Sequence, residues 1–345
     1  MSDFRLIPLS DVSEQKYTEF ISICPHAMFY HSWKYLQLLK KLLPLNEKYL
    51  IAVDSSNKIA GVIPLVYKSG PLGDVYNSLP FYGSNGGVLA IDKSAFDFLV
   101  TEYNKLISEN SSIVSSTLIS NPLRPEDDYT GVKHNYTDYR IGQFSSIKFD
   151  ENHAEQLMQM FHYKTRNMVR KAQKEGITIE MDNSAHEFLY DTHKSNIEAI
   201  GGKPKQRLFF DLFPGIYEKE KEYAIYVAKY NGETIAAMLV FLFNNTVEYY
   251  TPVIVEKFRD KQPLSLLIYE AMITYSKKGY KLWNWGGTWA SQGGVYTFKK
   301  RWGTFDVNYH YYTQINNEKV LSASKDDLLH MYDNFFVINF SELKS

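Results

Sequence analysis

The feature that most constrains the fold of this chain is a repeated β-hairpin pattern. Residues 49–65 contain two apolar, β-branched runs around a polar turn, and residues 223–239 repeat the arrangement around Asn231-Gly232. Asn-Gly is the strongest short-range signal for a hairpin turn. The repetition predicts two related α/β domains, and a chance likeness of two hairpins is the alternative. A chain of 345 residues is long enough for two cores.

Each half continues the hairpin in a similar way. In the second half we expect a third strand over 246–255, a helix from Pro263 to Lys278 that Gly279 ends, and a returning strand over 281–285. In the first half the corresponding elements are helices over 32–43 and 94–109 and a strand over 115–121. The fold class is therefore α/β (α+β), with two mixed, largely antiparallel sheets flanked by helices. We place the domains at 1–150 and 151–345, and the second opens with one long helix over 153–175.

Composition excludes several classes of protein. The net charge is -1, so no overall field attracts DNA or an anionic membrane, although a local patch leaves peripheral membrane contact open. The single Cys24 allows no internal disulfide, and the first residues contain no apolar signal segment, so we expect a cytoplasmic protein. No stretch has the length and hydropathy of a membrane span. No motif predicts a bound metal or a tightly held cofactor.

Two basic segments of the second half are candidate anion sites. Arg166, Arg170 and Lys174 recur every four residues and form one stripe of a helix, which suits phosphates, tRNA or a diphospholipid. The alternative is an ordinary solvated face. Arg259, Lys261 and Gln262 precede Pro263, where a helix N-terminus and neighbouring cations could hold a donor phosphate. That loop contains no glycine, and a plain surface turn is the alternative.

Candidate catalytic groups lie on either side of the returning strand. Residues 294–303 place Tyr296, Phe298, Lys299 and Arg301 among aromatic and basic neighbours that could clamp a phosphate or carboxylate, and a basic strand edge is the alternative. Tyr249 and Tyr250 alternate on the third strand and therefore face opposite sides of the sheet. One of them is our candidate for proton transfer, and core packing is the alternative for both.

At four stretches the sequence resembles the FemAB-type nonribosomal peptidyltransferases and related GNAT-like acyltransferases. In order along the chain, these stretches are 78–87, 164–176, 279–287 and 295–303. They are similar to the Ser-x-Pro-Phe…Gly-Gly segment, the basic helix, the Phe-Asp-Phe-Gly-Gly strand and the Tyr-x-Phe-Lys…Phe-Gly ending of that family. The order and spacing of the four match over roughly residues 30–310. The sequence departs from the family pattern at Asn284, where many relatives have Asp, and no stretch predicts a coiled-coil arm.

The resemblance implies two tandem GNAT-like domains and transfer of an acyl or aminoacyl group to an amine of a cell-envelope or polysaccharide precursor. Family members often modify peptidoglycan precursors with aminoacyl-tRNA, and others serve exopolysaccharide synthesis. The co-substrate here is therefore acyl-CoA or aminoacyl-tRNA: the missing arm favours a small donor, and the missing glycine loop favours tRNA. The acceptor is a small-molecule or lipid-linked amine. Lys299 corresponds to the family lysine that engages the activated donor, and Arg166 and Arg170 to its basic helix.

These expectations assign Lys299, Tyr249 and Tyr250 to catalysis and Arg259, Lys261 and Gln262 to the donor phosphate. The residues assigned to substrate binding are Arg166, Arg170, Lys174, Phe298, Tyr296, Arg301 and Asn284. A rival interpretation is a catalytically silent module of the same fold that binds a glycan or peptide through its aromatic side chains. A second rival is an adaptor for tRNA or lipid phosphate, which would need the Arg166 stripe to join a broad basic surface.

Overall fold

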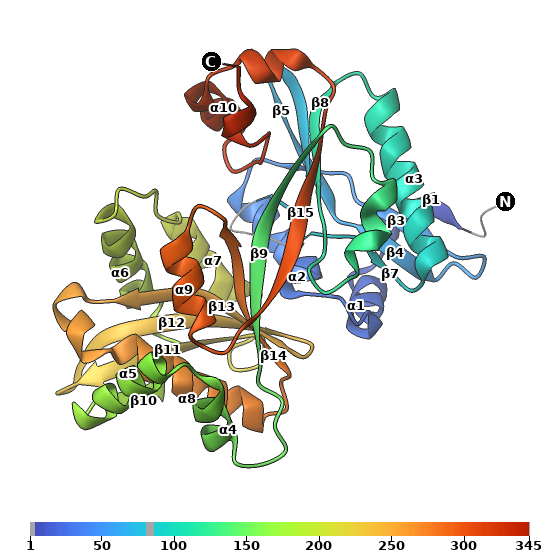
Figure 1. The fold of residues 1–345 in the computed structure, drawn as a ribbon. Helices are drawn as coiled ribbons and strands as arrows, with labels where there is room; N and C mark the ends of the chain where they lie inside the picture. Colours follow the sequence, from blue (N-terminus) through green and yellow to red (C-terminus); the bar gives the residue numbers. More distant parts are fainter. Residues whose placement is uncertain (1–3, 81–85, 345) are drawn as a thin grey trace. The chain divides into compact units, whose positions relative to one another are not determined.

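The computed structural model describes residues 4–80 and 86–344, and the chain forms two compact units (Figure 1). Unit 1 comprises Met1–Ile141 and Val307–Ser345, and unit 2 comprises Gly142–Asp306. The chain passes between the units within strand β9 (Tyr136–Ser146) and again within β15 (Phe305–Ile315). We expected residues 151–345 in one domain. Residues 307–345 instead belong to unit 1, because 311–315 of β15 pair with 115–119 of the first half.

Unit 1 is a mixed α/β unit. Its strands form the orders β1-β3-β4-β7 and β15-β8-β6-β5-β2. Its elements are β1 (Arg5–Ile7), α1 (Glu14–Ile23), α2 (Trp33–Leu42), β2 (Asn46–Glu47), β3 (Leu50–Val53), β4 (Ile59–Ile63), β5 (Leu65–Gly70), β6 (Gly73–Ser78), β7 (Leu89–Ala90), α3 (Lys93–Glu109), β8 (Ile113–Ile119) and α10 (Lys325–Met331). The pairs β3–β4 and β5–β6 are antiparallel, whereas β6 and β8 are parallel and α3 lies between them in the sequence.

A tight polar contact closes unit 1 near β7. The buried His31 ring hydrogen-bonds to the Gly87 carbonyl at 2.9 Å, and the Asn121 N–H donates to the Tyr129 hydroxyl at 2.9 Å. A Cβ atom at Gly87 would overlap the Asn121 backbone, and one at Gly86 would overlap the Ser78 carbonyl. Burial lowers the pKa of His31 to about 4, so the ring is neutral and acts as a packed structural group. Phe81 to Asn85, part of the first family-like stretch, lie outside the described residues.

Unit 2 is organised around the strand order β10-β11-β12-β13-β14. Its elements are α4 (His153–Met160), α5 (Tyr163–Lys174), β10 (Thr178–Met181), α6 (His186–Glu198), α7 (Arg207–Ile216), β11 (Tyr223–Tyr230), β12 (Glu233–Phe243), β13 (Thr246–Ile254), α8 (Pro263–Lys277), β14 (Leu282–Trp289) and α9 (Gly293–Lys300). Strands β10 to β13 are antiparallel, and β13 and β14 are parallel with α8 as the crossover.

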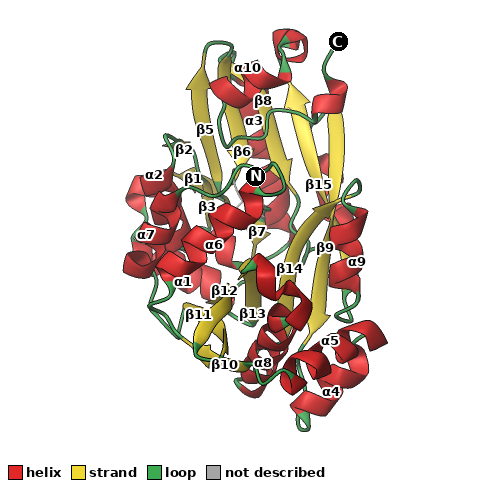
Figure 2. Ribbon diagram, turned by 90° about the vertical axis from the view of Figure 1, so that its left-hand side faces the viewer, coloured by secondary structure: helices red, strands yellow, loops and turns green. Residues whose placement is uncertain are grey.

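Side-chain alternation on β11 divides unit 2 into two helical layers. Tyr223 packs against Phe213 of α7, whereas Ala224 and Tyr226 belong to the core that contains the apolar face of α8. Helix α8 also packs against α4 and α5, and the three lie together in Figure 2. The sheet is therefore covered by α6 and α7 on one face and by α8 with α4 and α5 on the other. The mixed, largely antiparallel architecture expected from the sequence is confirmed in both units.

The turn and helix-end signals of the second half are also confirmed. Asn231 and Gly232 have φ values of 52° and 80°, the left-handed pair that a two-residue hairpin turn requires. Helix α8 begins at Pro263, which has no N–H to leave unsatisfied. Gly279, with φ 88°, follows the end of that helix.

Two local interpretations were wrong. The single helix expected over 153–175 is two helices, α4 and α5, interrupted at Phe161 and His162. The interruption is tertiary in origin, because the Phe161 ring packs on Trp302 at 4.9 Å and the His162 N–H donates to the Arg301 carbonyl. The segment around Lys299, for which a basic strand edge was the alternative, forms helix α9 instead.

Candidate active site

The candidate site is built where β13 and β14 separate. These parallel strands pair only over 246–248 and 282–284. Opposite β12, Val240 faces Tyr249 and Leu239 faces Thr251, so Tyr250 is an extra, bulged residue of β13. A bulge bends its strand and changes the local twist. Beyond it, the edge of β13 that faces β14 has no strand partner among the described residues, and an extended ligand could use that edge.

Lys299 anchors the other side of this separation. Its side chain is buried, with 7% of the residue exposed. Its ammonium donates to the Gly286 carbonyl at 3.1 Å, to the Gly287 carbonyl at 3.5 Å and to the Thr288 hydroxyl at 2.8 Å. Gly286 has φ 72°, and nothing lies within 4 Å of the position that its Cβ would occupy. Lys299 therefore places a positive charge beside backbone that borders open space.

Amide and hydroxyl groups behind Thr288 hold this arrangement. Gln143, from the end of β9, lies 3.5 Å from the Thr288 hydroxyl through its Oε1 atom. Its Nε2 atom donates to the Thr304 hydroxyl at 3.2 Å and to the Tyr296 carbonyl at 3.3 Å. These contacts join β9, β14 and α9, so the position of Lys299 depends on three elements that are distant in sequence.

Asn284 and Glu248 form a buried polar pair at the point of separation. The Asn284 amide donates to a Glu248 carboxylate oxygen at 2.7 Å and its Oδ1 atom accepts from the Gly286 N–H at 2.8 Å. Asn284 is 1% exposed and Glu248 is 2% exposed. Asn284, which we assigned to substrate binding, thus directs its amide into the protein and orients the Gly286 turn. An amide donor suits a carboxylate partner, so Asn284 can pair with Glu248 where a second carboxylate would repel it.

Tyr249 and Tyr250 point to opposite faces, as their alternation predicts. The Tyr249 ring lies 4.9 Å from Trp285, which in turn lies 6.2 Å from Phe298 beside Lys299. Burial raises the pKa of Tyr249, so its hydroxyl stays protonated and can donate a hydrogen bond but cannot act as a base near neutral pH. Tyr250 packs instead on Phe241, at 4.9 Å.

A half-buried lysine that we did not single out from the sequence lies over the Tyr250 ring. The Lys205 ammonium is 5.5 Å from the ring centroid. The backbone N–H of Lys205 donates to His193 Nε2 at 3.1 Å. Burial lowers the pKa of Lys205 to about 8, and burial followed by the charge of Lys205 lowers that of His193 to about 4. The sequence feature that could have pointed to Lys205 is the run Gly-Gly-Lys-Pro-Lys, in which small and basic residues precede α7.

The basic stripe of α5 has two different parts. Arg166 is partly buried and its Nη1 atom donates to the Phe161 carbonyl at 2.7 Å, which satisfies the C-terminal end of α4. Arg170 and Lys174 are exposed on the same helix. Only these two retain the solvent access that an anion-binding stripe needs.

The cations before α8 are paired with carboxylates. Arg259 contacts Glu256 at 2.6 Å and Lys261 contacts Glu175 at 2.6 Å. Gln262 adopts φ 61° and donates to the Arg259 carbonyl at 3.1 Å. A donor phosphate bound here would have to replace these ion pairs, which are partly or fully solvated and therefore weak.

The remaining predicted residues lie on or beside α9. Phe298 packs on Trp285 and Trp302, and the Tyr296 hydroxyl donates to Asp306 at 2.7 Å. Arg301 is half-buried, and its carbonyl accepts from the Thr165 hydroxyl. The structure therefore brings Tyr249, Asn284, Tyr296, Phe298 and Lys299 into one connected cluster. Arg259 and Lys261 instead contact Glu256 and Glu175, which lie outside this cluster.

Two kinds of site are absent from the described part of the chain. No helix there has the length and apolar character needed to cross a membrane. Within the same residues, no group of three or more His, Cys, Asp or Glu side chains is placed to hold a metal ion.

Comparison with known proteins identifies the fold. Residues 160–300 match the family model of the acetyltransferase (GNAT) domain. The structure of FemX is similar to this chain with a TM-score of 0.71 and 16% identity, covering 92% of this chain and 98% of FemX. No curated protein matches the sequence. The resemblance to FemAB-type, GNAT-like proteins is therefore confirmed at the level of fold.

Two further solved structures share the fold. L-PGS from Bacillus licheniformis has a TM-score of 0.53 and 11% identity, covering 89% of this chain and 93% of that protein. A conserved protein of unknown function from Bacteroides thetaiotaomicron has a TM-score of 0.59 and 12% identity, covering 92% of this chain and 100% of that protein. At these identities the likeness concerns the fold, and the activity has to be argued from the site.

Proposed function

We propose that this chain, whose residues 160–300 form an acetyltransferase (GNAT) domain on the FemX fold, transfers an acyl or aminoacyl group to an amine. The acceptor class that we favour is a small or lipid-linked amine of a cell-envelope precursor, such as a peptidoglycan or polysaccharide intermediate, made in the cytoplasm. The FemAB-like motifs around 279–287 and 295–303 support this choice. The donor is aminoacyl-tRNA or acyl-CoA.

The observation that carries the proposal is the buried ammonium of Lys299 beside open space at Gly286. A fixed positive charge in a site of low polarity stabilises negative charge that develops on a reacting carbonyl oxygen. Hydrogen bonds to Gly286, Gly287 and Thr288 fix the ammonium in position before the donor arrives. That preorganisation avoids a reorganisation cost during the reaction.

The proposed chemistry is simple acyl transfer. The acceptor nitrogen forms a bond to the donor carbonyl carbon while the carbon–oxygen bond of an ester, or the carbon–sulfur bond of a thioester, breaks. The amine loses one proton, and the departing hydroxyl or thiol gains one. Tyr249 stays protonated and is suited to donate a hydrogen bond, so we assign proton removal to water or to the substrate.

The donor segment would follow the unpartnered edge of β13 beyond Tyr250. The loop over 256–261 lacks glycine and its Arg259 and Lys261 already contact carboxylates, which weakens the case for a CoA pyrophosphate there. Arg170 and Lys174 are the two members of the α5 stripe that are exposed and accessible to a tRNA backbone. These features make aminoacyl-tRNA the first donor to test and acyl-CoA the second.

The test is a transfer assay with charged tRNA and acyl-CoA as separate donors and a peptidoglycan precursor bearing a free lysine amine as acceptor. We expect Lys299→Met to lower kcat by about 100-fold, the scale of losing one electrostatic group that stabilises the developing negative charge. Lys300→Met, which removes a half-exposed neighbour, is the matched control and should retain near wild-type turnover.

Thr288→Val tests the positioning of the Lys299 ammonium apart from its charge, because it removes one hydrogen bond to Lys299 but keeps the charge. We expect a smaller loss, about tenfold in kcat, with KM little changed. Turnover of Lys299→Met equal to that of Lys300→Met would contradict the assignment. Binding of acceptor without transfer from either donor would favour a silent binding module instead.

A further inference from the structure

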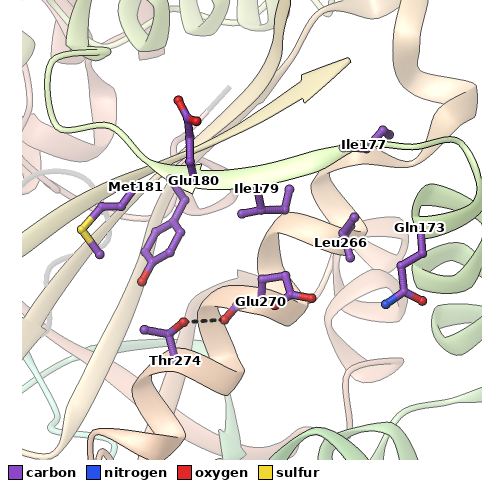
Figure 3. A pocket seen from close by; sticks show the side chains of 9 residues that line it. Gln173, Ile177, Ile179, Glu180, Met181, Leu266, Glu270 and Thr274 are labelled. Atoms are coloured by element: carbon purple, nitrogen blue, oxygen red, sulfur yellow. Dashed lines mark hydrogen bonds between the residues drawn. The ribbon is translucent and has the colours of Figure 1, made fainter. Parts of the chain in front are cut away.

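A pocket lies in unit 2 on the α8 face of the sheet (Figure 3). It encloses about 470 Å³, within the range of small-molecule sites. Its walls come from the end of α5, strand β10, strand β11 and helix α8. The lining residues are Gln173, Ile177, Ile179, Glu180, Met181, Tyr226, Leu266, Glu270 and Thr274.

One wall of the pocket is apolar. Ile177, Ile179 and Met181 recur at every second residue in and just before β10, so their side chains share one face of that strand. Leu266 lies one turn before Glu270 on α8, and Figure 3 shows Ile179 above Glu270 and Leu266 beside it. This wall suits the hydrocarbon part of a ligand.

The opposite wall carries one carboxylate, Glu270. It lies on a helix whose neighbouring residues Leu267, Ala271 and Met272 are fully buried. Within 4–80 and 86–344, the Glu270 carboxylate accepts no hydrogen bond and forms no ion pair. Burial raises its pKa, and the charge of Lys277 opposes that rise. A half-buried charge without a partner costs stability, and such groups gather at functional sites.

The second carboxylate that lines the pocket, Glu180, already has an ion-pair partner. Glu180 forms an ion pair with Lys229, and in Figure 3 its carboxylate points away from Glu270. The neutral polar groups of the lining are the Gln173 amide, the Thr274 hydroxyl, which donates to the Glu270 carbonyl, and the Tyr226 hydroxyl, which is buried without a hydrogen-bond partner among the described residues. The pocket thus has a single negative centre with neutral hydrogen-bonding groups around it.

This pocket is separate from the candidate active site. Its strands, β10 and β11, are the first two in the order β10-β11-β12-β13-β14, and Lys299 hydrogen-bonds to residues of β14. With neighbouring strands spaced about 4.8 Å apart, β11 lies roughly 14 Å from β14 and β10 roughly 19 Å. A molecule of one ring in the pocket would not reach the Lys299 ammonium.

We propose that this pocket is a binding site for a small organic ammonium ion whose apolar part is a single ring or a short alkyl chain. The ammonium contacts Glu270 and the Gln173 amide, and the apolar part packs on Ile177, Ile179, Met181 and Leu266. The proposal goes beyond the acyl transfer proposed above and does not depend on it.

The experiment measures binding of 2-phenylethylammonium by methyl NMR of the Ile and Met side chains, with 2-phenylethanol and 3-phenylpropanoate as the neutral and anionic probes of similar shape. We expect the ammonium ion to shift the Ile177, Ile179 and Met181 methyl signals. Glu270→Gln should weaken its Kd by about tenfold or more, the scale of a charge-assisted hydrogen bond. Glu180→Gln, the matched control, should change Kd by less than about twofold.

The neutral alcohol should bind more weakly to the wild type than the ammonium does, and Glu270→Gln should leave its affinity unchanged. The absence of ammonium binding at millimolar concentration would overturn the proposal. So would equal affinity of wild type and Glu270→Gln, or a preference for the anion. Because no acyl donor is present, these outcomes are independent of whether the chain catalyses transfer.

Discussion

The two units share a pair of parallel strands joined by a helix, but the glycines near that pair have opposite surroundings. Each has a pair of parallel strands joined by a helix, β6 and β8 around α3 in unit 1 and β13 and β14 around α8 in unit 2. In unit 1, Gly86 and Gly87 pack directly against the Ser78 and Asn121 backbone. In unit 2, Gly286, Gly293 and Gly294 have no atom within 4 Å of the Cβ position.

The difference shows how a shared architecture can serve packing in one unit and ligand access in the other. Glycine in unit 1 permits close approach of two backbone segments, and the His31 ring completes the contact. Glycine in unit 2 borders open space, and the group beside it is a buried cation, Lys299. Unit 2 is therefore where we expect chemistry, and unit 1 is where we expect stability to depend most on glycine.

The largest effect that would sharpen this comparison is Gly87→Ala. The added methyl group would overlap Asn121 backbone, which cannot move as a flexible side chain does, so we expect a loss of about 3 kcal/mol in the free energy of unfolding. Urea denaturation measures it. Gly294→Ala is the counterpart in helix α9 and should change stability by less than about 1 kcal/mol, in the stabilising direction. Equal losses for both variants would break the comparison.

A pH-dependent effect of intermediate size concerns Lys205. Its pKa is lowered from the ordinary 10.5 to about 8 in the folded state, so the unfolded state binds the proton more tightly. Stability of the wild type therefore falls as pH decreases from 10.5 to 8 and is constant below that. Lys205→Met lacks this loss. As pH decreases from 10.5 to 8, its free energy of unfolding relative to that of the wild type should therefore rise by roughly 1–3 kcal/mol. Denaturation at pH 7 and pH 10.5 tests it, and a pH-independent difference would contradict it.

The smallest effect separates the members of the basic stripe. Arg166→Ala removes the hydrogen bond to the Phe161 carbonyl and should cost about 1 kcal/mol of stability. Arg170→Ala should cost less than about 0.5 kcal/mol, because that side chain is exposed. If the stripe binds tRNA, Arg170→Ala should instead weaken tRNA binding in a filter or gel assay. A stability loss for Arg170→Ala equal to that for Arg166→Ala would show that both are structural.

Local signals predicted much of unit 2. The turn at Asn231-Gly232 and the limits of α8 follow from backbone preferences of the residues themselves. The alternation of Tyr249 and Tyr250 followed from strand periodicity. Long-range effects decided the rest. The interruption at Phe161 depends on Trp302, and the return of 307–345 to unit 1 depends on pairing with β8.

The candidate site was harder to predict for the same reason. Lys299 was found through family-like motifs, but its burial and its three hydrogen-bond acceptors depend on the path of β14 and on α9 being a helix. Val295, Tyr296 and Thr297 favour strands by propensity, so tertiary packing overrides the local preference there. Lys205 was missed because a lowered pKa reflects burial by distant residues, and sequence patterns do not report that.

The most direct test of the account is hydrogen exchange with the donor that supports transfer, charged tRNA or acyl-CoA, bound to the full chain. We predict protection of backbone amides over 249–255 and 285–294, where β13 and β14 separate and α9 begins, with exchange over 86–90 and 119–122 unchanged. Protection confined to those unit 1 segments, with none along β13 and β14, would contradict the assignment of donor binding to unit 2.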